Sequence, residues 1–204
     1  MGCSSCLAQR IGTDFQCGWC DSSCVDVSVT CSPPNNFVTA SSNCPSPMIT
    51  SISPNSGPTE GGTTVTINGT DLGTSFSDIV SITVGSLSCT PIENSYLVGR
   101  RISCDISSSS QAQQPGMANV VVTVSRMGGA NQDATFTQFR FGQPRVYSVS
   151  PLYGPAAGGT ILRVRGEDLN IGNTERTTVS LVATGSTGRR RRRQTMGTPS
   201  CDIM

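Results

Sequence analysis

Apolar and polar residues alternate along most of the chain after residue 48, in short runs separated by Gly- and Pro-rich turns. Alternation over about four to eight residues is typical of a half-buried β-strand, and turn residues between such runs favour antiparallel neighbours. The pattern therefore predicts an all-β chain, with roughly six or seven short strands in residues 46–142. The clearest runs are ITSIS (49–53), TTVTING (63–69), IVSITV (79–84), RISCDI (101–106), NVVVTV (119–124) and TFTQFRF (135–141).

The first two strands and the turn between them occur twice. Residues 49–73 match residues 146–170 at an offset of 97, and 11 of the 25 aligned positions are identical. A period near 100 residues is a domain length and is too long for a solenoid repeat. Each copy is expected to be an immunoglobulin-like sandwich, because the strand count and turn spacing fit that fold.

The charges exclude several classes of function. The chain has 204 residues and a formal net charge of +1, from 14 Arg against 13 acidic residues, with no His. Five arginines form a single run, Arg189–Arg193, so the rest of the chain is mildly acidic and lacks the spread basic face of a nucleic-acid binder.

The commonest general bases, His and Lys, are missing. The turn carboxylates, including Asp71 and Asp168, are expected to be solvated, and we expect neither an enzyme nor a cofactor.

The ten cysteines divide unevenly along the chain. Seven lie in the first 44 residues, and only Cys89, Cys104 and Cys201 follow. Two C-x2-C motifs could form a zinc site, and CGWC could be a redox pair. The three further N-terminal cysteines have no place in a four-thiolate site, so a disulfide-stapled domain in an oxidising compartment is favoured. Cys89 and Cys104 are the only pair in the first copy and are expected to bridge neighbouring strands.

The N-terminal segment resembles a PSI domain, the cysteine-rich knob of plexins, semaphorins and integrins. The resemblance rests on CSSCLAQRIGTDFQCGWCDSSC, residues 3–24. The family pattern has a further cysteine upstream of this segment, so Cys17 is expected to lack its partner. Trp19 is expected to pack between the bridges. The disulfides that the resemblance implies are Cys3–Cys44, Cys6–Cys24 and Cys20–Cys31.

Residues 47–73 resemble an IPT domain, through the pattern P-x-I-x-x-I-x-P-x-SGP-x-x-GGT-x-x-T-I-x-G-x-x-LG. A PSI knob followed by two IPT copies is similar to the stalk of a plexin, a semaphorin receptor. The resemblance implies a PSI domain at 1–45 that is incomplete at its N-terminus, an IPT domain at 46–142, and a second IPT domain at 143–204 that is incomplete at its C-terminus. Cys201 would correspond to Cys89 and would lack its partner.

The resemblance also implies a function. It indicates the extracellular part of a plasma-membrane glycoprotein receptor in signal transduction and axon guidance, with this segment as a spacer. Semaphorin would bind a domain upstream, and plexin enzymatic activity towards small GTPases would lie in a cytoplasmic region. The alternatives are the equivalent stalk of a hepatocyte-growth-factor-receptor-like tyrosine kinase and a Rel-like nuclear protein. The segment itself shows no signal peptide and no stretch of about 18 apolar residues.

Two motifs mark candidate modification sites. NGT, at residues 68–70, is the only N-x-[ST] sequon and predicts a glycan on Asn68, in a turn after a strand. Arg190, Arg192 and Arg193 satisfy the R-x-[KR]-R preference of furin-type convertases, which predicts cleavage after Arg193 in an exposed loop. An inert loop and a gene-model error are the alternatives. No nucleic acid or metal is expected as a partner, and the sequence leaves self-association open.

Overall fold

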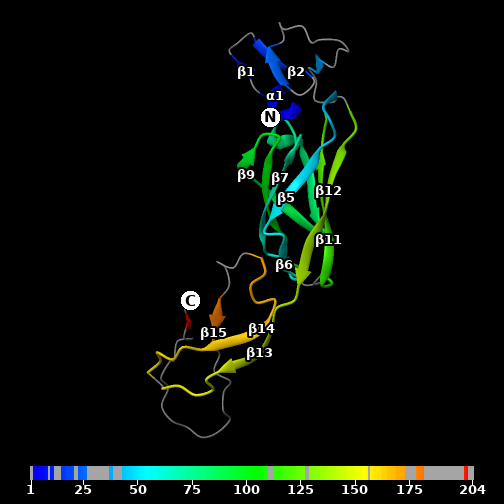
Figure 1. Ribbon diagram of the computed structural model, residues 1–204. Coiled ribbons are helices and arrows are strands. Elements are labelled where there is room, and N and C mark those ends of the chain that lie inside the picture. Colours follow the sequence, from blue (N-terminus) through cyan, green and yellow to red (C-terminus); the bar gives the residue numbers. More distant parts are fainter. Residues whose placement is uncertain are drawn as a thin grey trace.

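In the computed structural model, more than half of the described residues lie in β-strands. Figure 1 shows three bodies in a row: a small knob, a β-sandwich and the strand pair of the second copy. Within the described ranges, no helix is long and apolar enough to cross a membrane. The predominance of strands confirms the all-β fold class. The described residues are 2–8, 10–11, 15–20, 23–26, 37–38, 43–109, 113–126, 129–155, 157–172, 178–181 and 200–201, leaving aside the side chains of 10–11, 15–17, 37 and 200–201.

The knob contains a short helix and a small antiparallel sheet. Strand β2 pairs with β1, β3 and β4. Trp19, on β2, lies opposite Cys24 and Val38 and is half-buried. Cys31 lies outside the described residues, as does the side chain of Cys17. The elements of the knob are α1 (Cys3–Leu7), β1 (Arg10–Ile11), β2 (Phe15–Cys20), β3 (Ser23–Asp26) and β4 (Phe37–Val38).

The first sandwich is built from strands in the order β5-β7-β10-β9-β8-β11-β12-β6. Strand β9 pairs with β8 at its start and with β10 along the rest, so it joins the two halves. A short 3-10 turn, η2 (Phe76–Asp78), precedes β8. The strands are β5 (Met48–Ser53), β6 (Ser56–Pro58), β7 (Thr64–Thr70), β8 (Ile79–Val84), β9 (Leu87–Leu97), β10 (Arg101–Ile106), β11 (Gly116–Val124) and β12 (Gln132–Gly142).

The sequence pattern does not reveal two of these strands. Strand β6 has only three residues and pairs parallel with the end of β12, where the Gly/Pro motif predicts a tight crossing. Strand β9 contains Pro91, Glu93 and Asn94, so its sequence lacks the alternation that marks the other strands. Strand β6 depends on a partner far away in the sequence, whereas β9 pairs with its sequence neighbours β8 and β10 and escapes detection because it lacks the alternation.

The core of the first sandwich follows the predicted alternation. On β7, Val65 and Ile67 are fully buried, while the residues between them face outward. Phe139 and Phe141 of β12 meet edge to face, with ring centroids 5.1 Å apart. Burying a side chain of this kind stabilises the fold by about 1.5–3 kcal/mol. The remaining large, fully buried apolar side chains are Leu72, Val84, Ile102, Ile106, Val120, Val122 and Val124.

Asn68 lies inside β7 and not in the turn that the sequence suggested. It pairs with Ser51 on β5 and Arg101 on β10. The strand continues this far because Gly69 lets β5 approach closely: a Cβ there would lie 2.2 Å from the carbonyl oxygen of Met48. Since Ile67 points inward, Asn68 points outward, and its Nδ2 donates to Ser51 Oγ at 3.2 Å.

The second copy repeats the first hairpin of the sandwich. Strands β13 (Arg145–Ser150) and β14 (Arg163–Glu167) pair antiparallel, and β15 (Val179–Ser180) pairs with β16 (Ser200–Cys201). Val146 is 59% exposed, whereas its counterpart Ile49 is 7% exposed. Among the described residues, β13 and β14 form a two-stranded sheet of their own, separate from the sheet of β15 and β16. The predicted domain bounds remain a prediction, and Arg189–Arg193 lie outside the described residues.

Candidate functional site

Within the knob, helix α1 lies between the small sheet and the first sandwich (Figure 1). A helix of five residues is too short to be stable alone, and two disulfides fix it. The bridges are Cys3–Cys44, with Cα atoms 5.6 Å apart, and Cys6–Cys24, with Cα atoms 5.4 Å apart. Cys20 is also disulfide-bonded. The structure thus contains two of the three N-terminal pairs that the PSI resemblance implied, and the partner expected for Cys20 is not among the described residues.

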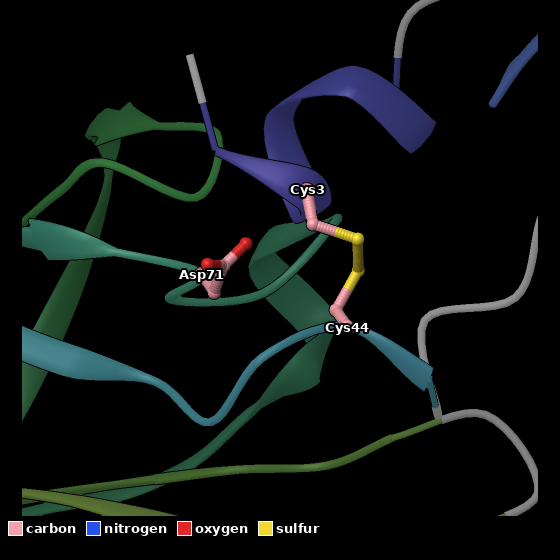
Figure 2. Close-up of side chains that lie close together, drawn as sticks. All are labelled: Cys3, Cys44 and Asp71. Atoms are coloured by element: carbon pink, nitrogen blue, oxygen red, sulfur yellow. A yellow bond between two sulfur atoms is a disulfide. The ribbon is translucent and has the colours of Figure 1, made fainter. Parts of the chain in front are cut away.

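A candidate metal group lies at the start of α1. Cys3, Cys44 and Asp71 bring two sulfurs and a carboxylate oxygen within 4.8 Å of one another (Figure 2). Figure 2 also shows the bond between the two sulfur atoms. A cysteine must be a thiolate to bind a metal ion, so this oxidised pair cannot supply ligands. The proximity of Asp71 to the bridge has a different explanation.

Asp71 connects the sandwich to the knob. It occupies the turn after β7 with a left-handed backbone, φ 57°, and it is only 5% exposed. Its Oδ1 accepts a hydrogen bond of 2.8 Å from the backbone N–H of Ser4 in α1. The expectation that this carboxylate is solvated was therefore wrong. No local pattern indicates this contact, because the two residues are 67 positions apart.

Arg126, just after β11, also contacts both Ser4 and Asp71. It is 5% exposed, and its Nη1 donates to Ser4 Oγ at 3.3 Å. Its Nη2 donates to the carbonyl oxygens of Pro45, at 2.9 Å, and Asp71, at 3.3 Å. Burial lowers the pKa of Arg126, and the negative charges of Asp71 and Asp78 oppose that shift. One guanidinium thus contacts helix α1, the segment at Pro45 that leads from the knob to β5, and the turn that carries Asp71.

The turn between β9 and β10 also contacts helix α1, through Ser5. Ser5 Oγ donates to the carbonyl oxygen of Val98 at 2.7 Å. Gly99 has φ 65°, and a Cβ on it would lie 2.8 Å from Ser5 Oγ. Glycine is therefore needed both for the backbone conformation and for the close approach. We call the set Ser4, Ser5, Asp71, Gly99 and Arg126 the knob joint.

Side chains behind the knob joint hold its two turns together. Tyr96 OH donates to the carbonyl oxygen of Gly73 at 3.0 Å and accepts from the Gly99 N–H at 3.3 Å. Burial raises the pKa of this phenol. Burial also acts to raise the pKa of Asp78, but hydrogen bonds from Thr74 and Ser75 outweigh it, and the pKa is lowered. Hydrogen bonds to Tyr96 and Asp78 of the first sandwich therefore stabilise the turn that carries Asp71.

A second joint connects the first sandwich to the second copy. Arg140 on β12 forms a two-point ion pair with Asp168, with Nη1–Oδ1 at 2.9 Å and Nη2–Oδ2 at 3.1 Å. The hydrogen bond to Asp168 raises the pKa of Arg140. Gly142 lies against this carboxylate, and Gly172 lies against Pro58 and Thr63 of the sandwich. We call Arg140, Gly142, Asp168 and Gly172 the copy joint.

Comparison with known proteins places this architecture in a family. The sequence matches the IPT/TIG domain family over residues 47–138 and 144–189. It is 36% identical to mouse Plexin-B2 over 181 residues and 32% identical to human Plexin-A2 over 178 residues. These matches cover 88% and 84% of the chain but only 9% of each relative.

A solved structure agrees with these relatives. The full extracellular region of Plexin A4 superposes with a TM-score of 0.65 at 31% identity, over 84% of this chain and 17% of that one. The sequence-based resemblance to a plexin ectodomain segment is thereby confirmed. The chain belongs to the IPT/TIG domain family, and over most of its length it is similar to the extracellular region of plexins.

Proposed function

We propose that this segment is a structural spacer in the extracellular stalk of a plexin-like receptor, which supports semaphorin signalling without binding semaphorin itself. The observation that carries the proposal is the knob joint, where Ser4 is fully buried and Asp71 and Arg126 are each 5% exposed. Domains joined in one chain move relative to each other unless their interface restrains them. Buried polar groups that are hydrogen-bonded across an interface favour one orientation.

A buried disulfide supports a location outside the cell. The Cys89–Cys104 bridge lies in the sandwich core, with the two residues 3% and 0% exposed. Disulfides of this kind form in oxidising compartments and are rare in nuclear proteins, which disfavours the Rel-like alternative. The relatives described above are plexins, which disfavours the growth-factor-receptor alternative. The proposal assigns the segment no enzymatic activity.

The spacer proposal is tested on the full chain by small-angle X-ray scattering and surface binding. We expect scattering that a single arrangement of the knob and the first sandwich fits, and no binding of a semaphorin at micromolar concentration. Asp133→Asn, at an exposed carboxylate hydrogen-bonded to Thr123 on the outer face of the sandwich, is the control and should change neither result. Scattering that requires many orientations, or micromolar binding, would overturn the proposal.

We also propose an N-linked glycan on Asn68. Asn68 and Thr70 lie two residues apart on β7, so both point to the outer face of the sheet, where the sequon is accessible. Secreted protein should carry a glycan mass on the peptide that contains Asn68. Thr70→Ala should abolish it, while Ser51→Ala, which removes only the neighbouring hydroxyl, should leave it. A bare Asn68 in secreted wild-type protein would contradict the proposal.

The arginine run suggests proteolytic processing in the same pathway. We propose cleavage after Arg193 by a furin-type convertase, because Arg190, Arg192 and Arg193 form its preferred pattern. Expression in convertase-competent cells should release a new N-terminus at Gln194, and Arg193→Ala should prevent this. Arg189→Ala is the matched control, since it keeps Arg190, Arg192 and Arg193 and should leave cleavage after Arg193 intact. An uncut wild-type chain would exclude processing here.

A further inference from the structure

The same four-residue segment ends strand β7 of the first IPT copy and strand β14 of the second and forms the turn that follows. Its sequence is G-x-D-L in both: Gly69–Leu72 in the first and Gly166–Leu169 in the second. Both aspartates have a left-handed backbone, with φ 57° and 53°. Asp and Asn adopt this conformation more readily than other side chains. A Cβ on either glycine would collide with a backbone carbonyl, 2.2 Å away in the first copy and 1.9 Å in the second. The two turns are therefore built alike.

Each of these aspartates contacts the module that precedes its own. Asp71 accepts the backbone N–H of Ser4 in the knob. Asp168 accepts two hydrogen bonds from the guanidinium of Arg140 in the first sandwich. The donors differ in chemistry and in distance along the chain, 67 residues in one case and 28 in the other. The turn and its acceptor are constant, and only the donor changes.

A glycine of the preceding module lies beside the carboxylate in both joints. A Cβ on Gly2 would lie 3.2 Å from Asp71 Oδ1, and a Cβ on Gly142 would lie 2.5 Å from Asp168 Oδ2. The second distance is too short for any real side chain, so the carboxylate occupies space that Gly142 leaves open. The glycine thus allows the backbone of the preceding module to reach the acceptor.

We propose that the G-x-D-L turn is an intermodular docking site, through which each IPT domain binds the module before it. The partner that fits is a hydrogen-bond donor, either a backbone N–H or a guanidinium, presented next to a glycine. The inference rests on the proposed spacer function and deepens it, because it names the contact that sets the angle between successive modules. The turn serves the neighbouring module as well as its own fold.

The test replaces the aspartates in the full chain with residues that keep the turn. Asp71→Gly and Asp168→Gly retain a left-handed backbone but lack the acceptor, and Asp71→Asn and Asp168→Asn retain an acceptor oxygen. Hydrogen exchange of the Ser4 amide should accelerate about tenfold or more in Asp71→Gly, since the carboxylate that accepts this N–H is gone. In Asp71→Asn the rate should stay within a few-fold of wild type.

The second joint has its own measurement. Asp168→Gly should broaden the range of module orientations seen by small-angle scattering, and Gly142→Ala should do the same from the other side of the contact. Circular dichroism should show intact strand content in each variant. If Asp71→Gly leaves the exchange rate of the Ser4 amide unchanged and Asp168→Gly leaves the scattering unchanged, the docking site is overturned while the spacer proposal stands. A flexible wild-type chain would overturn the spacer instead.

Discussion

The knob joint and the copy joint are made by the same turn of the same domain type, but they differ in burial. At the knob joint, Asp71 is covered by α1, the linker at Pro45 and the guanidinium of Arg126. At the copy joint, the side chain of Asp168 is 14% exposed and that of Arg140 is 48% exposed. An exposed ion pair contributes little and is screened by salt. The comparison indicates that the neighbouring module determines how deeply the joint is buried.

The largest effect is expected from the bridge beside the knob joint. Cys3→Ala combined with Cys44→Ala removes a disulfide that closes a separation of 41 residues, which should lower the free energy of unfolding by about 3–4 kcal/mol. Because α1 is too short to persist without support, its contacts with Asp71 should be lost as well. Thermal unfolding and exchange of the Ser4 amide measure the two effects. Full retention of Ser4 protection would show that the joint does not need the bridge.

Arg126→Ala should have the next largest effect. It removes the donor to the buried carbonyl oxygen of Asp71 and to the partly buried carbonyl oxygen of Pro45, at an expected cost of about 2–4 kcal/mol. Arg101→Ala is the control, because Arg101 is exposed on the outer face of β10. Denaturant unfolding of both variants gives the comparison. Equal stability of the two would mean that the buried guanidinium contributes nothing to the joint.

A smaller effect is expected at Gly99. Gly99→Ala and Gly62→Ala each place a side chain at a left-handed position, φ 65° and 79°, costing about 1–2 kcal/mol each. Only Gly99→Ala also brings a Cβ within 2.8 Å of Ser5 Oγ; at Gly62 the nearest atom is 3.4 Å away. The Gly99 variant should therefore be the less stable and the only one to accelerate exchange of the Ser5 amide. Identical behaviour would remove Gly99 from the joint.

The smallest effect belongs to the copy joint. Arg140→Ala should leave the unfolding midpoint nearly unchanged, because the ion pair is open to solvent. Module orientation should respond instead: scattering of the wild type in about 1 M NaCl should approach that of Arg140→Ala, since salt shortens the screening length to about 3 Å. Salt should not alter the protection of Ser4. A copy joint that resists salt would contradict the comparison between the two joints.

Much of the fold could be predicted from the sequence. Alternation identified most strands of the first sandwich, because a strand with one buried face needs apolar residues at every second position. The repeat identified the second copy, and the cysteine density identified the knob. Strand β6 escapes this pattern because it has three residues and a distant partner, and β9 escapes it because Pro91, Glu93 and Asn94 interrupt the alternation. Asn68 was misplaced by one structural element because Gly69, a residue typical of turns, lies inside the strand.

The joints could not be predicted in this way. The G-x-D-L turn is the same in both copies, so the sequence determined the left-handed aspartate and the turn it closes. Whether that carboxylate is buried depends on what the chain brings against it, and Ser4 and Arg126 meet there although they are 122 residues apart. Local preferences act over a few residues, whereas desolvation depends on every group that excludes water from a site. The sequence alone therefore determined most strands, the repeat and the turn, and only the tertiary structure buried Asp71 under the knob and paired Asp168 with a half-exposed Arg140.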